Sequence, residues 1–196
     1  MHIKDWKKEI FTIPNVLSMI RLALIPIYMI IYLNAENASH YYVSAGILAV
    51  SCLTDLIDGQ IARRCNMVST LGKMLDPFAD KATQFTLIIC LAIRRNLLLL
   101  WCLIALFVAK EGFQLIAGSI ILHKGKILSG AVLPGKICTA ILFISLVLMI
   151  MLPGLSDRMI NIITIIDGVF MIISFISYIL VYTGHIQIIE DIDDPT

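Results

Sequence analysis

Residues 54–81 read TDLIDGQIARRCNMVSTLGKMLDPFADK and carry four aspartates in two closely spaced pairs. Asp55 and Asp58 are three residues apart and Asp76 and Asp80 are four apart, so each pair lies on one face of a helix. The stretch between the pairs is polar and allows the two helices to lie antiparallel. The four carboxylates then converge near one membrane surface, where they repel one another unless a cation lies between them.

Divalent cations remove this repulsion. Mg²⁺ and Mn²⁺ prefer oxygen ligands and suit sites that also hold substrate phosphates, and four carboxylates are enough to hold two such ions. Gly59 and Gly72 leave room for a ligand to approach the backbone, and the guanidinium of Arg63 matches the geometry of a phosphate. The segment therefore predicts a two-metal site for a substrate that contains a pyrophosphate.

The composition indicates a membrane protein. The chain has 196 residues, of which 59% are hydrophobic and 15% are charged, whereas about a quarter of the residues in a soluble domain are charged. A transmembrane helix needs about 20 apolar residues, so this chain has room for six. The net charge of +1 gives no basic surface of the kind that binds nucleic acid. We expect an all-α integral membrane protein with a bundle of six transmembrane helices.

Three regions are expected along the chain. Residues 1–12 combine lysines with apolar residues at helical spacing, which predicts an amphipathic helix at the membrane interface. Residues 13–186 form the membrane domain, and residues 187–196 form an acidic cytoplasmic tail that is exposed and frayed. The six spans are expected at about 13–34, 41–64, 70–93, 97–122, 131–152 and 159–183.

The basic residues between the spans predict the orientation. With the N-terminus in the cytoplasm, eight lysines and arginines lie on cytoplasmic segments and three lie outside, namely Arg94, Arg95 and Arg158. This bias favours both termini in the cytoplasm and an active site that faces it. The adjacent Arg94 and Arg95 run against the bias. Residues 1–15 contain no small-residue cleavage site, so we expect the first span to be retained and not removed as a signal peptide. A site on the cytoplasmic side suits a bacterial inner membrane, with an organelle membrane as the alternative.

The spacing of the 54–81 segment resembles the signature of the CDP-alcohol phosphatidyltransferase family. Its eight fixed positions are matched by Asp55-x2-Asp58-Gly59-x2-Ala62-Arg63-x8-Gly72-x3-Asp76-x3-Asp80. The resemblance implies a homodimeric enzyme of phospholipid biosynthesis that uses two divalent cations, Mg²⁺ or Mn²⁺. It would transfer a phosphatidyl group from CDP-diacylglycerol to an alcohol and release CMP.

The same resemblance implies residue roles. The metal ligands would be Asp55, Asp58, Asp76 and Asp80. Asp80 would also be the general base that takes the proton of the acceptor hydroxyl. The pocket for the CDP-lipid would be formed by Asp55, Gly59, Ala62, Arg63 and Gly72.

The acceptor is suggested by other segments. Residues 13–21 resemble the PNxLTxxR opening of phosphatidylglycerophosphate synthases and of the cardiolipin synthases in this family, and Lys110-Glu111 and residues 135–139 resemble further synthase segments. The acceptor or phosphate-binding candidates are Asn15, Arg21, Lys110 and Lys136. We expect sn-glycerol 3-phosphate as acceptor. Gly118, however, lies where those synthases usually carry an arginine, which keeps phosphatidylglycerol, giving cardiolipin, as the alternative.

Simpler interpretations exist for several of these residues. Arg21 is also suited to extending its charge to the lipid headgroups, and Lys110 and Glu111 to a buried ion pair that fixes helix packing. Asp167 is expected to form a structural hydrogen bond with a neighbouring helix. A small ion transporter is a further alternative for the whole chain, but its carboxylates would be expected near the midplane of the membrane rather than toward one face.

Overall fold

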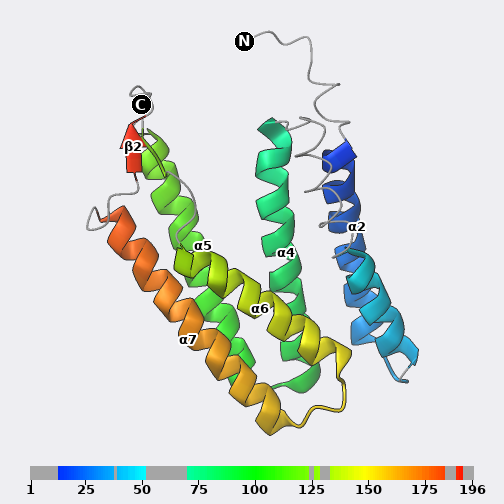
Figure 1. The fold of residues 1–196 in the computed structure, drawn as a ribbon. Coiled ribbons are helices and arrows are strands. Elements are labelled where there is room, and N and C mark those ends of the chain that lie inside the picture. Colours follow the sequence, from blue (N-terminus) through cyan, green and yellow to red (C-terminus); the bar gives the residue numbers. More distant parts are fainter. Residues whose placement is uncertain are drawn as a thin grey trace. The chain divides into compact units, whose positions relative to one another are not determined.

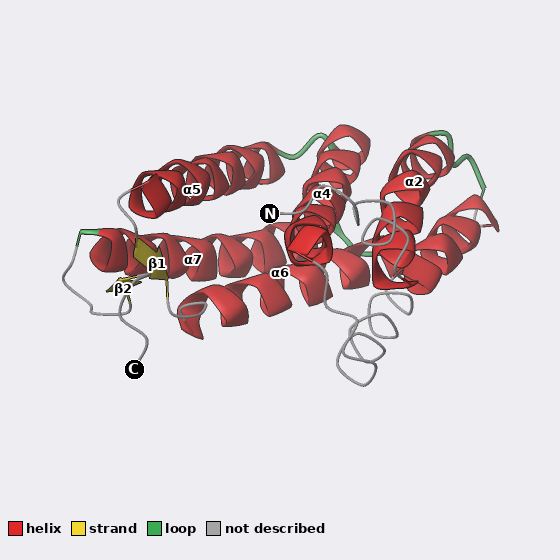
Figure 2. Cartoon of the chain, turned by 90° about the horizontal axis from the view of Figure 1, so that it is seen from above, coloured by secondary structure: helices red, strands yellow, loops and turns green. Residues whose placement is uncertain are grey.

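The computed structural model describes residues 13–37, 39–51, 70–123, 126–128, 133–183 and 189–191. These residues form six helices and two short strands (Figures 1 and 2). They group into two compact units, each described here by itself: residues 1–94 with 147–153, and residues 95–146 with 154–196. The helices are α2 (Ile13–Leu33), a helix over 39–51, α4 (Thr70–Arg95), α5 (Leu98–His123), α6 (Leu133–Met151) and α7 (Asp157–Tyr182).

The helix positions confirm the helical class of the chain. Each described helix begins and ends within about two residues of the expected span, except that the second is described only over 39–51. Three helical stretches are long and apolar enough to cross a membrane, and they are Leu98–Ile121, Leu133–Met151 and Asp157–Tyr182. A shorter apolar stretch covers Ser18–Leu33. Six spans therefore remain a prediction, and the interfacial helix expected at 1–12 lies outside the described residues.

Helix α7 has the polarity of a helix surrounded by lipid. Its buried residues recur at alternating steps of four and three, which marks one face, and this face includes Thr164, Asp167 and Ser174. The exposed face carries isoleucines, among them Ile165 and Ile172. Polar side chains that turn inward while large apolar ones turn outward are typical of a transmembrane bundle, because lipid cannot satisfy hydrogen bonds.

In the first unit, Arg94 near the end of α4 holds the end of α2. Its Nη1 donates to the Leu33 carbonyl at 3.2 Å, its Nη2 donates to the Ala35 carbonyl, and its Nε donates to the Tyr41 hydroxyl at 2.9 Å. The guanidinium also lies over the Tyr41 ring, 5.5 Å from its centroid. A cation at a helix C-terminus satisfies carbonyls that have no partner within the helix and interacts favourably with the helix dipole. Arg94 thus ties α2, α4 and the 39–51 helix together.

In the second unit, aromatic rings join α5 to α7. The Phe113 ring of α5 lies edge-on to Phe175 and Tyr182 of α7, with centroids 5.4 and 5.8 Å apart, and Tyr178 stacks near Tyr182 at 6.2 Å. Helix α6 is joined to α7 by a hydrogen bond of 2.8 Å from the Ser145 hydroxyl to the Asp167 carboxylate. This bond confirms the structural role expected for Asp167.

Two segments that we expected to be irregular pair as strands. β1 (Lys126–Leu128) and β2 (Ile189–Asp191) are antiparallel, with Lys126 opposite Asp191. The expectation of a frayed tail is therefore wrong for residues 189–191. Strand pairing satisfies backbone groups that an isolated tail would leave to water.

Arg94→Gln tests the contacts that hold the end of α2. We expect the substitution to lower the free energy of unfolding by about 1–3 kcal/mol, because a charged donor to several acceptors is lost. Thermal unfolding of the detergent-solubilised protein measures the effect. Arg158→Gln is the matched control, since Arg158 is exposed and no contact of its side chain is found in the described region. Equal stability of the two variants would contradict the proposed contribution of Arg94.

Gly135→Ala tests the packing of α6 against α7. A Cβ at Gly135 would lie 2.5 Å from the Tyr178 hydroxyl oxygen and 2.8 Å from a ring carbon, so the tyrosine must move. We expect a loss of about 1–3 kcal/mol in unfolding free energy, which is typical of overpacking. Gly168→Ala is the control because its Cβ would meet nothing within 4 Å. A Gly135→Ala protein as stable as the control would show that Tyr178 does not lie against Gly135.

Candidate functional site

The structure describes only part of the predicted metal and CDP-lipid site. Five of its residues lie outside the described residues, and they are Asp55, Asp58, Gly59, Ala62 and Arg63. Gly72, Asp76 and Asp80 lie along α4, and Asn15 lies in the first turn of α2. Asp76 and Asp80 are one helical turn apart on a continuous helix, as the sequence predicted. Their roles as ligands and base remain predictions.

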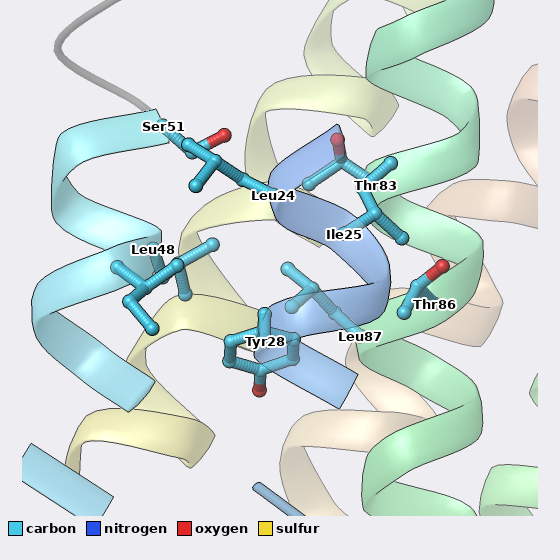
Figure 3. A pocket seen from close by; sticks show the side chains of 9 residues that line it. Leu24, Ile25, Tyr28, Leu48, Ser51, Thr83, Thr86 and Leu87 are labelled. Carbon is cyan, nitrogen blue, oxygen red and sulfur yellow. The ribbon is translucent and has the colours of Figure 1, made fainter. Parts of the chain in front are cut away.

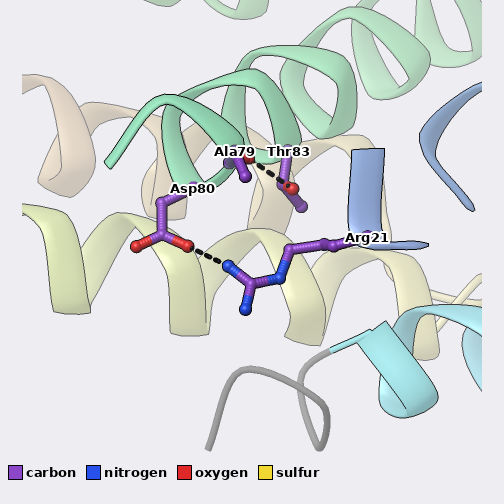
Figure 4. A network of polar contacts seen from close by, with 4 residues as sticks. All are labelled: Arg21, Ala79, Asp80 and Thr83. Carbon is purple, nitrogen blue, oxygen red and sulfur yellow. Dashed lines mark hydrogen bonds and ion pairs between the residues drawn. The ribbon is translucent and has the colours of Figure 1, made fainter. Parts of the chain in front are cut away.

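The structure brings together two candidate residues that are 59 positions apart in the chain. Arg21 of α2 donates from Nη1 to Oδ1 of Asp80 on α4 at 2.6 Å (Figure 4). The Arg21 side chain is only 3% exposed, whereas the Asp80 side chain is 46% exposed. A short hydrogen bond between ionised partners is among the stronger contacts that a side chain makes. Arg21 is therefore buried and paired with Asp80.

Other polar side chains line the same two helices. Ser18 of α2 and Thr83 and Gln84 of α4 are all buried. The Thr83 hydroxyl donates to the Ala79 carbonyl at 2.8 Å, within α4 (Figure 4). Ser18 is three residues before Arg21, and Gln84 is four residues after Asp80, so these side chains follow the faces that carry the ion pair. The pair lies on a polar stripe of α2 and α4.

Two contacts along α2 and α4 define their direction. Arg21 contacts Asp80 about two-fifths of the way along both helices, and Arg94 contacts Leu33 at the C-terminal end of both. The two helices are therefore parallel, with the 39–51 helix between them in sequence. Asp80 and Arg94 are 14 residues apart on α4, which corresponds to about 21 Å of helix. The ion pair thus lies well inside both helices, and the Arg94 contacts are at their C-terminal ends.

An apolar pocket borders the ion pair. It is lined by α2, the 39–51 helix and α4, with Leu24, Leu48 and Leu87 among its walls (Figure 3). Leu24 is three residues after Arg21, and Thr83, which also lines the pocket, is three residues after Asp80. Ser51, Thr83, Thr86 and Tyr28 add hydroxyl groups to a wall that is otherwise apolar. The ion pair and this small pocket are therefore about one helical turn apart along α2 and α4.

The residues present fit divalent cations in their chemistry. Among the described residues, no group of three His, Cys, Asp or Glu side chains comes together. Asp80 is the predicted ligand whose side chain is described, and its carboxylate is a hard oxygen donor of the kind that Mg²⁺ and Mn²⁺ prefer. A carboxylate has about four lone-pair positions, so the bond from Arg21 leaves Asp80 able to bind a cation as well.

Lys110, an acceptor candidate of the second unit, lies near the Tyr178 ring, and the residue before the candidate Lys136 packs against the same ring. Lys110 is buried, with its Nζ 2.9 Å from Glu111 Oε1 and 6.0 Å from the centre of the Tyr178 ring. Gly135 packs against the same ring, and the next residue, Lys136, is exposed. Lys110 is thus in the buried ion pair that we considered as its simpler role. Lys136 keeps the exposure that a phosphate contact requires.

Position 118 lies beside a tyrosine hydroxyl. A Cβ at Gly118 would be 3.5 Å from the Tyr182 hydroxyl oxygen, which is an ordinary contact distance. The backbone of Gly118 therefore lies beside the phenol of Tyr182. At the position where the related synthases usually have an arginine, this chain has a glycine and a neighbouring tyrosine.

Sequence reasoning missed Tyr178, Thr83 and Gln84 as neighbours of the candidate residues. Tyr178 follows the buried face of α7 at helical spacing, which was a usable signal. Thr83 and Gln84 follow Asp80 by three and four residues, which was also a usable signal. The pairing of Arg21 with Asp80 had no such signal, because the spacing of residues on different helices carries no information about contact.

Comparison with known proteins supports the resemblance. The sequence model of the CDP-alcohol phosphatidyltransferase family matches residues 11–180. A cardiolipin synthase (CMP-forming) of Streptomyces coelicolor is 36% identical over 121 residues, covering 60% of this chain and 54% of that protein. A CDP-diacylglycerol–glycerol-3-phosphate 3-phosphatidyltransferase of Rickettsia bellii is 37% identical over 95 residues, covering 48% of this chain and 51% of that protein. A cardiolipin synthase (CMP-forming) of Rattus norvegicus is 46% identical over 72 residues, covering 36% of this chain and 22% of that protein.

The family match covers most of the chain, whereas the alignments span about half of the Streptomyces and Rickettsia proteins and less of the rat protein. The matched region includes the whole 54–81 segment and the helices α2, α4, α5 and α6. It ends close to the C-terminus of α7. The chain belongs to the CDP-alcohol phosphatidyltransferase family.

Proposed function

We propose that this chain transfers a phosphatidyl group from CDP-diacylglycerol to an alcohol and releases CMP. The observation that carries the proposal is the carboxylate of Asp80, which is half-exposed and forms an ion pair with the buried guanidinium of Arg21. It lies one turn after Asp76, in the spacing of the family signature. A carboxylate in this setting is suited to both metal ligation and proton transfer.

Asp80 acts on the acceptor in this proposal. Its carboxylate accepts the proton of the acceptor hydroxyl, and the oxygen forms a bond to the phosphorus that carries the diacylglycerol. The bond from that phosphorus to the bridging oxygen of the pyrophosphate breaks, and CMP leaves. The reaction depends mainly on alignment and charge stabilisation, because the substrate already contains a good leaving group.

Two divalent cations, Mg²⁺ or Mn²⁺, would be held by Asp55, Asp58, Asp76 and Asp80. When bound, the cations stabilise negative charge on the phosphates and on the attacking oxygen. Gly59, Ala62, Arg63 and Gly72 would form the CDP-lipid pocket with Asp55. The carboxylate chemistry of the set and the helical spacing of Asp76 and Asp80 support this assignment.

For the acceptor, we propose phosphatidylglycerol, which would make cardiolipin, with sn-glycerol 3-phosphate as the second candidate. Gly118 beside the Tyr182 hydroxyl offers no cation for a phosphate monoester, and Lys110 is already paired with Glu111. Relatives from Streptomyces and rat are named cardiolipin synthases. The exposed Lys136 and the Rickettsia relative, which is named for glycerol 3-phosphate, favour the second candidate.

We propose a bacterial inner membrane protein with its site facing the cytoplasm, and a homodimer as in the family. Arg94 and Arg95 counted against this orientation when the sequence alone was considered. Arg94 contacts the carbonyl groups at the end of α2, and Arg95 lies 3.5 Å from the Asp157 carboxylate. Lysines and arginines are biased to the cytoplasmic side of a membrane. The local partners of Arg94 and Arg95 give each of them a structural reason to lie on the opposite side, and so support the proposed orientation.

CMP release tests the proposed function and its acceptor together. The purified chain is given CDP-diacylglycerol and Mg²⁺ with one acceptor at a time, and we expect release with phosphatidylglycerol. Release only with glycerol 3-phosphate would assign phosphatidylglycerophosphate synthesis instead. Release with neither, from protein that is folded and binds CDP-diacylglycerol, would contradict both acceptors, and serine and inositol phosphate would then be tried.

Asp80→Asn tests the base. We expect turnover to fall by at least about 100-fold, because the amide cannot accept the proton, while CDP-diacylglycerol still raises the melting temperature. Asp76→Asn, the comparison, should instead weaken Mn²⁺ binding measured by titration. Undiminished turnover in Asp80→Asn would remove it as the base.

A further inference from the structure

The ion pair between Arg21 and Asp80 has unequal burial, with the cation inside and the anion half-exposed. We propose that Arg21 is a positioning residue that fixes the orientation of the Asp80 carboxylate, and that it does not bind substrate phosphate itself. This inference rests on the proposed function, in which Asp80 is the base. It assigns to Arg21 a role other than the phosphate contact or headgroup contact that the sequence suggested.

The burial of Arg21 favours this role. The residue is 2% exposed, and its side chain is already bonded to Asp80 at 2.6 Å. An arginine that receives a phosphate from the cytoplasmic side has to present its guanidinium to that side. Here the carboxylate is the exposed partner, at 46%, and the guanidinium lies behind it. A substrate that approaches the pair therefore meets Asp80 first.

The geometry of the contact fixes the carboxylate. Arg21 Nη1 holds Oδ1, and the other carboxylate oxygen lies on the side away from the guanidinium (Figure 4). Torsions that end in a carboxylate are broad, so an Asp side chain without a firm partner samples many orientations. A planar guanidinium restricts that motion, and a base must be aligned with the proton that it takes.

The surroundings hold Arg21 in place. Ser18 is fully buried on α2, and Thr83 and Gln84 are buried on α4, so the pair lies within a packed polar stripe. Thr83 donates its hydroxyl hydrogen to the Ala79 carbonyl within α4. A buried guanidinium is costly without an anionic partner, and this cost keeps Arg21 on Asp80.

Arg21→Lys tests whether Arg21 acts through the planar geometry of its guanidinium or through its positive charge alone. Lysine keeps the positive charge but replaces the planar fork with a flexible ammonium group. We expect kcat for CMP release to fall by about 10- to 100-fold, the loss typical when a partner that orients a catalytic ligand is removed. The KM values for CDP-diacylglycerol and for the acceptor should stay within about threefold of wild type, since no substrate contact is lost. The rise in melting temperature caused by CDP-diacylglycerol, which does not depend on turnover, should also be retained.

Arg158→Lys is the control, because Arg158 is exposed and outside the candidate site. It should leave kcat, KM and the lipid-induced rise in melting temperature unchanged. A tenfold or larger rise in acceptor KM for Arg21→Lys, with kcat maintained, would overturn the inference and make Arg21 a phosphate ligand. Wild-type kinetics in Arg21→Lys would overturn it as well.

A second variant covers the case in which Arg21→Lys does not fold. Asp80→Glu keeps both charges but moves the carboxylate by one methylene, so the positioning role predicts a similar loss of kcat with CDP-diacylglycerol binding retained. Full activity of Asp80→Glu would contradict it. Failure of the proposed function is recognised separately, because wild-type protein would then release no CMP with any acceptor.

Discussion

Two arginines, one near the middle of the helices and one at their C-terminal ends, hold α2 and α4 together in a parallel arrangement. Arg21 extends from α2 to the Asp80 carboxylate, and Arg94 extends from α4 to the Leu33 carbonyl. Each guanidinium satisfies a charge or a helix end that lipid would leave without a partner. Because each contact joins corresponding positions along the two helices, the two contacts fix how far α2 is shifted along α4. The position of Asp80 within the first unit depends on this alignment of the two helices. The candidate site depends on it for the same reason.

Polar side chains that need a partner inside the protein also shape the second unit, but their contacts there are weaker than those of the two arginines. Asp167 receives a hydrogen bond from Ser145, and Lys110 pairs with Glu111 beneath the Tyr178 ring. The isoleucines of α7 face outward, where a soluble protein would place polar groups. Helices in lipid gain little from burying apolar surface against one another, so these polar contacts and the aromatic packing of Phe113 provide specificity. The chain therefore uses its few charged residues at helix contacts.

The sequence predicted the helices well because their signal is local. A run of apolar residues long enough to cross a bilayer marks a helix whatever its neighbours are, and the bounds of α5, α6 and α7 follow from it. It also predicted that Asp76 and Asp80 share a face, since helical spacing is fixed. It did not predict β1 and β2, because three residues are too few for a periodic pattern.

Partner choice between helices was beyond the sequence for a physical reason. Arg21 was equally compatible with a phosphate, a headgroup or a carboxylate, and only the packing of α2 against α4 selects Asp80. Lys110 was likewise compatible with a phosphate, and the adjacent Glu111 already satisfies it. In both cases a cation at the edge of a predicted site has a protein anion as its partner. Such a cation has a structural partner within the protein, whatever further contact it makes with a substrate. The role of a basic residue near the family signature is therefore best inferred from its burial and its partner. Its charge alone does not show whether it binds a substrate phosphate or holds another side chain in place.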